Sequence, residues 1–394
     1  MFQTVSDYIF FNRVRGCLQI LVISNEMLKV EVNEMVEFRL LEEREFQQAI
    51  ELADKVFRKE GHISMGAAFP QVFSHALHQS YGAFIDGTLV SFIGLVPSIL
   101  HIESAEVQAY SIGAVCTEPE YRKRGIANTL LQMIFDHVNK SGASILFISG
   151  DLPLYIKQGC TFYGKLKQYK IQQVDLKQET AYHVRELQPT DWFQMRKISQ
   201  RRPVRYEQSI FEMAQLNESA GFASIFKMKH KVLVAEENKQ IKAFIIFGVP
   251  YQEQKNVESR IIEWGGDPTA IVSLLKEAVT YGIDSLLFNI PTYEKELIQK
   301  LDLALESVEQ SFPGTIKIMN LDLLLQQLAP YFKDKLQISN IDENNKSLIN
   351  KKNSVSINNR ELEELILKGN NNIDSYSKDL FPVPFPFPQG LNYV

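Results

Sequence analysis

Alternating and helical patterns of apolar residues in the first half of the chain predict one α/β unit over residues 35–171. Residues 36–41 form a strand-like segment, and residues 45–57 carry apolar side chains on one face of a helix. A hairpin is expected at 82–95, where Asp86-Gly87 supplies the turn. The other predicted elements of this unit are strands at 99–110, 111–116, 145–148 and 163–172 and helices at 128–139 and 154–158.

A second unit over residues 181–318 repeats this order of elements. Its predicted elements are strands at 184–187, 260–267 and 285–290, helices at 192–199 and 268–281, and a hairpin at 231–247. The two units together predict two α/β domains in tandem.

The C-terminal region, residues 319–394, is predicted to be small and partly irregular. Helices are expected at 321–332 and 361–367, and the polar segment 340–358 is interpreted as a flexible loop or a mobile β-hairpin. Prolines keep 381–394 extended, and its phenylalanines are too apolar for a free tail, so this tail is expected to dock into a groove. The alternative, a proline-rich ligand for another protein, lacks the usual basic anchors.

Length and composition restrict the class of protein. A chain of 394 residues, 45% hydrophobic and 23% charged, is typical of a globular protein with two or three domains. Its net charge of -5 argues against a nucleic-acid partner. Three widely spaced cysteines, together with histidines that form no ligand motif, predict a reducing, cytoplasmic location and no metal. Homo-oligomerisation is left open.

The N-terminal residues 1–34 are interpreted as an extension that precedes the first domain. Their apolar run, 18–23, is too short to span a bilayer, so no membrane partner is expected. Arg13 and Arg15 before this run are compatible with a signal peptide, but no small-residue cleavage site follows.

One motif carries most of the chemical information. The strand at 111–116 breaks at Thr117-Glu-Pro119, and a basic, glycine-bearing turn then leads directly into an amphipathic helix. Unpaired amides at a helix N-terminus form an anion site, and a glycine lets a bulky phosphate approach the backbone. A pyrophosphate-bearing ligand suits this turn. Its residues are Arg122, Lys123, Arg124, Gly125, Ile126 and Ala127.

The turn, R-x-x-G-x-A after a strand and a proline break, resembles the acetyl-CoA signature of the GNAT N-acetyltransferases. The order of elements is also similar to the GNAT fold, which predicts an α/β (α+β) protein with two tandem GNAT-like domains and a small C-terminal region. In the second unit the segment 264–268, Trp-Gly-Gly-Asp-Pro, replaces the motif, and the charge of Asp267 would repel a phosphate. That unit is therefore predicted to be degenerate. The whole arrangement resembles the enhanced-intracellular-survival-type acetyltransferases.

This resemblance implies an N-acetyltransferase that moves an acetyl group from acetyl-CoA to a primary amine in a direct ternary complex. It implies that the strand edge Ala114-Val115-Cys116 pairs with the pantetheine amides of the cofactor. It further implies that Tyr155, in Tyr-x-x-x-Gly159, protonates the leaving thiolate, and that the terminal carboxylate of Val394 is the general base.

Several alternatives accompany these assignments. Glu118 and Glu120 are other candidates for the base, Cys116 for a covalent acyl carrier, and His75 and His78 for the wall of the acceptor site, although packing or surface roles suit them better. Tyr155 has the alternative of a packing role.

The acceptor is expected to be an amine of a small molecule or a peptide. The acidic balance of the chain favours a cationic amine, with carboxylates lining the cleft. Two non-enzymatic alternatives are a CoA-binding regulatory module without turnover and a scaffold whose tail captures a partner.

Overall fold

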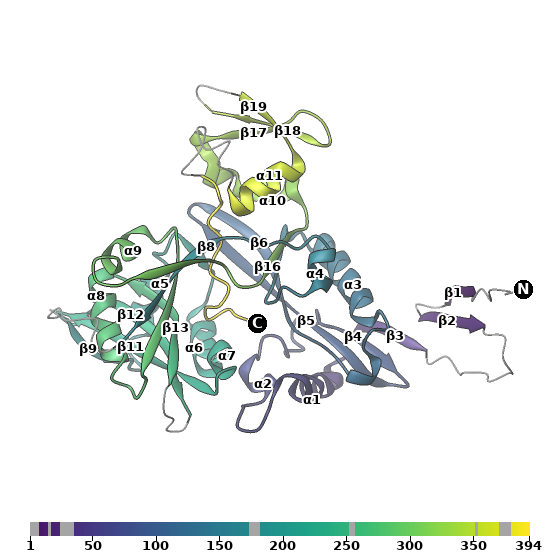
Figure 1. The fold of residues 1–394 in the computed structure, drawn as a ribbon, viewed down its shortest axis with the longest axis horizontal. Helices are drawn as coiled ribbons and strands as arrows, with labels where there is room; N and C mark the ends of the chain where they lie inside the picture. Colours follow the sequence, from purple (N-terminus) through teal and green to yellow (C-terminus); the bar gives the residue numbers. More distant parts are fainter. Residues whose placement is uncertain are drawn as a thin grey trace, which may run out of the picture.

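The computed structural model describes residues 8–14, 17–23, 35–172, 182–251, 257–350, 354–369 and 380–394. These residues build two large mixed sheets, each covered by helices, and a small antiparallel sheet near the C-terminus (Figure 1). The predicted α/β class with two GNAT-like units and a small C-terminal region is confirmed. Within the described residues, no helix has the length and apolar character needed to cross a membrane.

The first sheet has nine strands and provides the framework of the first domain. Its strand order is β1-β2-β3-β4-β5-β6-β7-β16, and β10 pairs with the far end of β5. The strands are β1 (Tyr8–Val14), β2 (Cys17–Ile23), β3 (Val36–Leu40), β4 (Tyr81–Ile85), β5 (Thr88–Ile102), β6 (Ala105–Thr117), β7 (Ile145–Ile148), β10 (Val204–Tyr206) and β16 (Thr315–Ile318).

Helices cover both faces of this sheet, as the strand pattern requires. Successive residues of a strand point to opposite faces. In β4, Ala83 and Ile85 accordingly join the core beneath α3, whereas Phe84 joins the core beneath α1. The helices of this domain are α1 (Phe46–Phe57), α2 (Met65–Ala68), α3 (Ile126–Ser141) and α4 (Pro153–Lys157), with 3₁₀ turns η1 (Glu43–Glu45) and η2 (Pro119–Tyr121).

The second sheet has seven strands in the order β15-β8-β14-β13-β12-β11-β9. Its strands are β8 (Lys165–Ile171), β9 (His183–Glu186), β11 (Met228–Glu237), β12 (Gln240–Pro250), β13 (Glu258–Gly266), β14 (Ser285–Pro291) and β15 (Ser307–Ser311). The helices of this domain are α5 (Trp192–Ser199), α6 (Ile210–Ser219), α7 (Gly221–Ser224), α8 (Pro268–Ala278) and α9 (Lys295–Leu301).

The two large sheets exchange a strand. The segment predicted as the last strand of the first unit, observed as β8, pairs instead with β14 and β15 of the second sheet. In return β16, at the end of the second predicted unit, pairs with β7 of the first sheet. Neither predicted range, 35–171 or 181–318, therefore encloses a complete sheet. Apolar periodicity reveals a strand but not its partner, which is why the sequence did not show this exchange.

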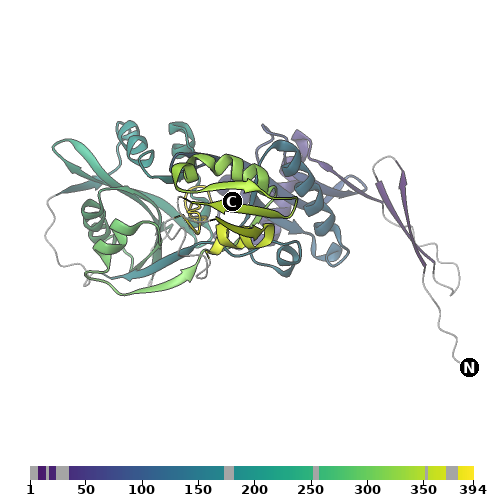
Figure 2. The same cartoon turned by 90° about the horizontal axis from the view of Figure 1, so that it is seen from above.

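The C-terminal region sits over the middle of the molecule (Figure 2). The segment 340–358, predicted as a loop or hairpin, contributes to a three-stranded sheet in which Lys346 is buried and its Nζ lies 2.5 Å from Asp322 Oδ1 and 2.7 Å from Asn340 Oδ1. The elements of this region are α10 (Leu321–Phe332), η3 (Lys333–Lys335), β17 (Gln337–Asn340), β18 (Asn345–Ile349), β19 (Ser354–Asn358) and α11 (Asn359–Lys368).

The final segment, 380–394, runs from this region down between the two large sheets (Figure 1). Phe385 packs edge-on against Phe147 of β7, at a ring-centroid distance of 6.4 Å, and Phe387 packs against Phe312 at 5.6 Å. Leu391 then enters the core of the second domain. Buried aromatic side chains thus hold the end of the chain at the junction of the two domains.

Candidate active site

The first component of the site is an unpaired strand edge. β6 pairs with β5 as far as Thr117, but its parallel pairing with β7 ends at Ile112 and Ile148. One extra residue of β6 stands opposite β5 at this point, and Ala114 has a left-handed backbone with φ of 53°. Such a bulge redirects a strand. Among the described strands, none pairs with the β7 side of β6 beyond Ile112.

The second component is the start of α3. Gly125 is the N-cap residue with φ of 80°, and no side chain caps this 16-residue helix. The first amides of a helix have no intrahelical acceptor, and the helix dipole adds partial positive charge. A Cβ placed on Gly125 would meet no atom within 4 Å, so the space in front of the turn is open. This combination of open space and unsatisfied donors suits an anion.

The basic residues of the turn lie at the surface. Arg122, Lys123 and Arg124 are exposed; Arg122 Nε donates to Thr117 O at 3.0 Å, and the Arg124 guanidinium lies 4.9 Å from the Tyr121 ring centre. Ile126 is buried in the core under α3 and Ala127 is half-buried. The predicted residues of the turn therefore contribute backbone amides and a positive surface, whereas the Ile126 side chain contributes packing.

The acidic residues beside the turn lie outside the strand opening. Glu118 forms an ion pair with Lys55, whose Nζ lies 2.7 Å from its Oε2, and Glu120 is exposed. Cys116 is 3% exposed and packs on the α1 side of the sheet. Burial raises the pKa of its thiol to about 12, so the thiol stays protonated at neutral pH. A buried, protonated thiol is a poor nucleophile, which favours the packing role of Cys116.

A cavity of about 310 Å³ lies where the strand opening, α1, α2 and the end of the chain converge. Ala114 and Val115 of β6 line one side, and the segment after β7 lines another. The complete lining is Phe57, Arg58, His62, Met65, Phe69, Ile112, Ala114, Val115, Ile148, Ser149, Gly150, Leu152, Tyr155, Ile225, Tyr393 and Val394. The cavity thus brings together Ala114, Val115, Tyr155 and Val394, four of the residues singled out from the sequence.

Tyr155 lies on the short helix α4, which follows β7. Its side chain is 4% exposed and lines the cavity. Burial raises the pKa of its hydroxyl to about 12, so this hydroxyl keeps its proton throughout the neutral and mildly alkaline range.

Val394, the last residue of the sequence, lies directly against β6. A Cβ on Gly113 would be 3.1 Å from the carboxyl carbon of Val394, so a side chain at position 113 would crowd the terminus. The preceding Tyr393 packs against the Phe222 ring at 4.8 Å and shares a hydrogen bond with Ser149. Contacts from both domains therefore place Val394 beside the strand opening.

Two further expectations can be compared with the structure: carboxylates lining the cleft, which is wrong, and the surface role favoured for His75 and His78, which agrees with their exposure. Among the described lining residues there is no Asp or Glu side chain, so the cleft is not lined by carboxylates other than the chain terminus. His75 and His78 are exposed and lie outside the lining, and His75 faces Glu43 at 3.5 Å. The histidine in the wall is His62.

Sequence reasoning missed the side of the cavity formed by Arg58, His62, Phe69 and Ile225. The first three follow α1 in a segment without periodicity, and Ile225 comes from the second domain. The only available signal was that α1 ends at Phe57 and an irregular segment follows.

In the second domain, the helix start that corresponds to the α3 turn is capped by the side chain of Asp267. There the Asp267 side chain accepts a hydrogen bond from Ala270 N at 2.9 Å and thereby caps α8. A Cβ on Gly266 would lie 2.1 Å from Lys242 O, so the backbone is packed tightly just before this helix. A carboxylate that caps the helix N-terminus uses one of its amides, and its negative charge repels a phosphate.

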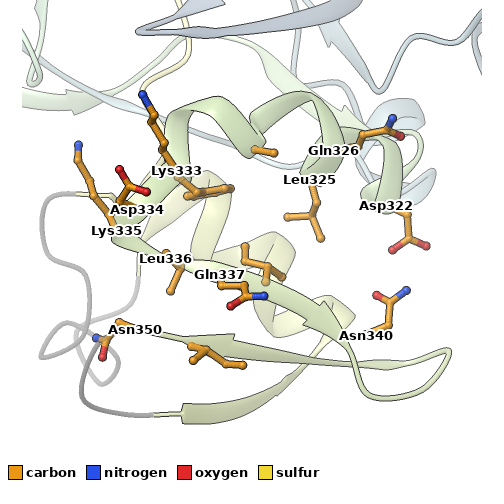
Figure 3. Close-up of a pocket in the computed structure, with 14 residues that line it drawn as sticks. Asp322, Leu325, Gln326, Lys333, Asp334, Lys335, Leu336, Gln337, Asn340 and Asn350 are labelled. Carbon is orange, nitrogen blue, oxygen red and sulfur yellow. The ribbon is translucent and has the colours of Figure 1, made fainter.

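A second, larger cavity of about 950 Å³ lies in the C-terminal region between α10 and β17 (Figure 3). Exposed Lys333, Asp334 and Lys335 lie along it, and no residue of the strand opening contributes to it. It therefore lies apart from the candidate site. Within the described part of the chain, no group of three or more His, Cys, Asp or Glu residues is arranged to hold a metal ion.

Comparisons with known proteins agree with this geometry. An acetyltransferase (GNAT) domain family matches residues 37–163. A probable N-acyltransferase of unknown function from Enterococcus faecalis has a similar structure, with a TM-score of 0.63 and 14% identity, over 87% of this chain and 92% of that chain. No curated protein sequence matches the chain.

Two further solved structures have the same fold. Eis1 from Mycobacterium abscessus is similar with a TM-score of 0.57 and 12% identity over 91% of this chain and 96% of that chain. A GCN5-related N-acetyltransferase from Anabaena variabilis is similar with a TM-score of 0.56 and 12% identity over 82% of this chain and 85% of that chain. The chain therefore carries an acetyltransferase (GNAT) domain at residues 37–163, and over most of its length it shares the fold of these solved structures.

Proposed function

We propose that the protein transfers an acetyl group from acetyl-CoA directly to a primary amine, without an acyl-enzyme intermediate. The observation that carries this proposal is the convergence of the open edge of β6, Tyr155 and Val394 on one cavity. The cofactor would bind once per chain, because the equivalent helix of the second domain is capped by Asp267.

The cofactor would be held by backbone groups of the first domain. The pyrophosphate would accept hydrogen bonds from the amides at the start of α3, with Arg122, Lys123 and Arg124 supplying positive charge around it. The pantetheine amides would pair with the open edge of Ala114–Cys116, as an added strand pairs with a sheet edge. The Val115 amide would then face the thioester oxygen and stabilise the developing oxyanion.

The transfer itself needs one base and one acid. The amine nitrogen attacks the thioester carbonyl, the C–N bond forms, and the C–S bond breaks as the tetrahedral intermediate collapses. The proton of the amine passes to the Val394 carboxylate through water, and the Tyr155 hydroxyl protonates the departing thiolate. Burial that holds the pKa of Tyr155 near 12 keeps it in the required protonated form before each turnover.

The first test concerns the cofactor. Gly125→Glu adds bulk and a negative charge where the pyrophosphate is expected, so the affinity for acetyl-CoA should fall by roughly 100-fold or more. Calorimetric titration measures this directly. Gly282→Glu is the matched control, because Gly282 also has a left-handed backbone, with φ of 70°, and open space around it. Equal affinities of the two variants would remove the α3 turn from the binding site.

The second test concerns the acid. Tyr155→Phe removes only a hydroxyl, so turnover should drop by about 10²- to 10⁴-fold while the dissociation constant of acetyl-CoA stays the same. Tyr163→Phe is the control, since the Tyr163 hydroxyl is also buried, lacks a hydrogen-bond partner among the described residues and lies outside the cavity. Turnover is followed by the release of free thiol. Turnover by Tyr155→Phe at the wild-type rate would give Tyr155 a packing role.

The third test concerns the base. Adding two glycines after Val394 displaces the terminal carboxylate from its place beside Gly113, so turnover should fall by about 10²-fold or more. The same two residues added before Met1 serve as the control and should leave turnover unchanged. If the C-terminally extended protein is as active as the control, the end of the chain has only a structural role.

A further inference from the structure

The part of the cavity that faces away from the strand opening is mainly apolar. Phe57, Leu152 and Ile225 line it although their side chains are 43%, 57% and 38% exposed, and buried Met65 and Phe69 form its floor. Large apolar side chains that stay in contact with water around one cavity favour a ligand with an apolar body. The volume of about 310 Å³ is at the lower end for ligand pockets, which favours a small molecule.

Arg58 places a positive charge in this apolar wall, and the nearby Asp54 carboxylate balances it only through space. Its Nη2 donates to Ser224 Oγ at 3.1 Å, while its buried Nε has no hydrogen-bond partner among the described residues. The nearby carboxylate of Asp54 is already used by the Ser64 hydroxyl and the Met65 amide. Within the described chain, no carboxylate lies within 4.0 Å of the Arg58 guanidinium nitrogens. Burial also lowers the pKa of Arg58.

This charge is unfavourable for a polycationic acceptor. Such a molecule needs several carboxylates to balance its ammonium groups, and the lining offers the Val394 terminus as its negative charge. A second ammonium group would approach Arg58 in an enclosed, apolar setting, where like charges repel strongly. An anionic group at the same place would instead pair with the positive charge of the Arg58 guanidinium.

We infer that the acceptor is a small primary amine whose aromatic or branched aliphatic body also carries an anionic group, and that Arg58 binds this group. The inference rests on the proposed acetyl transfer for its biological meaning, but it concerns binding and is testable without turnover. Arg58 would thus determine acceptor specificity, with the amine directed towards Val394 and the apolar body against Phe69.

The test compares three probes on the full chain saturated with CoA. L-Phenylalanine has an aromatic body and a carboxylate, phenethylamine lacks the carboxylate, and spermidine is a polycation. Calorimetry should show that phenylalanine binds at least about 10-fold more tightly than phenethylamine, and that spermidine binds more weakly than either. This comparison uses the wild-type protein and needs no variant.

Variants then test whether Arg58 is responsible. In Arg58→Gln the preference for phenylalanine over phenethylamine should disappear, and Arg58→Lys should restore part of it because the charge returns without the planar group. Lys59→Gln is the matched control: it removes the same charge from the neighbouring exposed residue, which lies outside the cavity, and should keep the full preference.

The outcomes separate the two proposals. No binding of phenylalanine, equal binding of phenylalanine and phenethylamine, or tightest binding of spermidine would overturn the inference about the acceptor. Thiol release measured with the same three amines and acetyl-CoA tests the transfer itself. A preference for phenylalanine in binding that depends on Arg58, without thiol release from any amine, would uphold the inference and contradict the proposed function.

Discussion

The candidate site depends on the point at which the pairing of β6 and β7 ends. Up to Ile112 and Ile148 the two strands form a parallel ladder, and beyond it the bulge at Ala114 turns β6 away. Buried backbone groups without partners cost about 1–3 kcal/mol each, so an open strand edge in the middle of a sheet is stable only where water or a ligand reaches it. The end of the chain lies beside the same opening, where Val394 lines the cavity next to Gly113. Each proposed role, from phosphate binding to proton transfer, follows from this local geometry.

The second domain helps to position the end of the chain. Its own sheet supplies contacts for the tail, since Leu391 enters its core and Phe222 packs against Tyr393. Asp267, at the place equivalent to the α3 turn, occupies the N-terminus of α8 and so removes the one feature that a phosphate would need. The exchange of β8 and β16 ties the two domains together, because each large sheet contains a strand from the other half of the chain. Contacts from the second domain thus help to hold Val394 against the first domain.

Much of the fold and part of the candidate site could be predicted from the sequence. The features that could not be predicted have physical reasons. The elements with strong periodicity, such as α5 and α10, were placed correctly, and the turn around Gly125 was found because glycine and basic residues precede an amphipathic helix. The partner of β8 could not be predicted, because a strand with apolar residues on alternate positions fits either sheet. The side of the cavity that contains Arg58 was also not predicted. Arg58 lies in an irregular segment, and it becomes part of a cavity only because Ile225 of the second domain also lines it.

The most direct measurement of the central claim is hydrogen–deuterium exchange of the full chain with and without CoA. If CoA binds the first domain as proposed, it should slow the exchange of the amides of 115–117, on the open edge of β6. It should also slow the exchange of the amides of 125–128, at the start of α3. No change is expected at 267–270, where Asp267 already caps α8. Protection confined to α8, or no change in either segment of the first domain, would contradict this proposal.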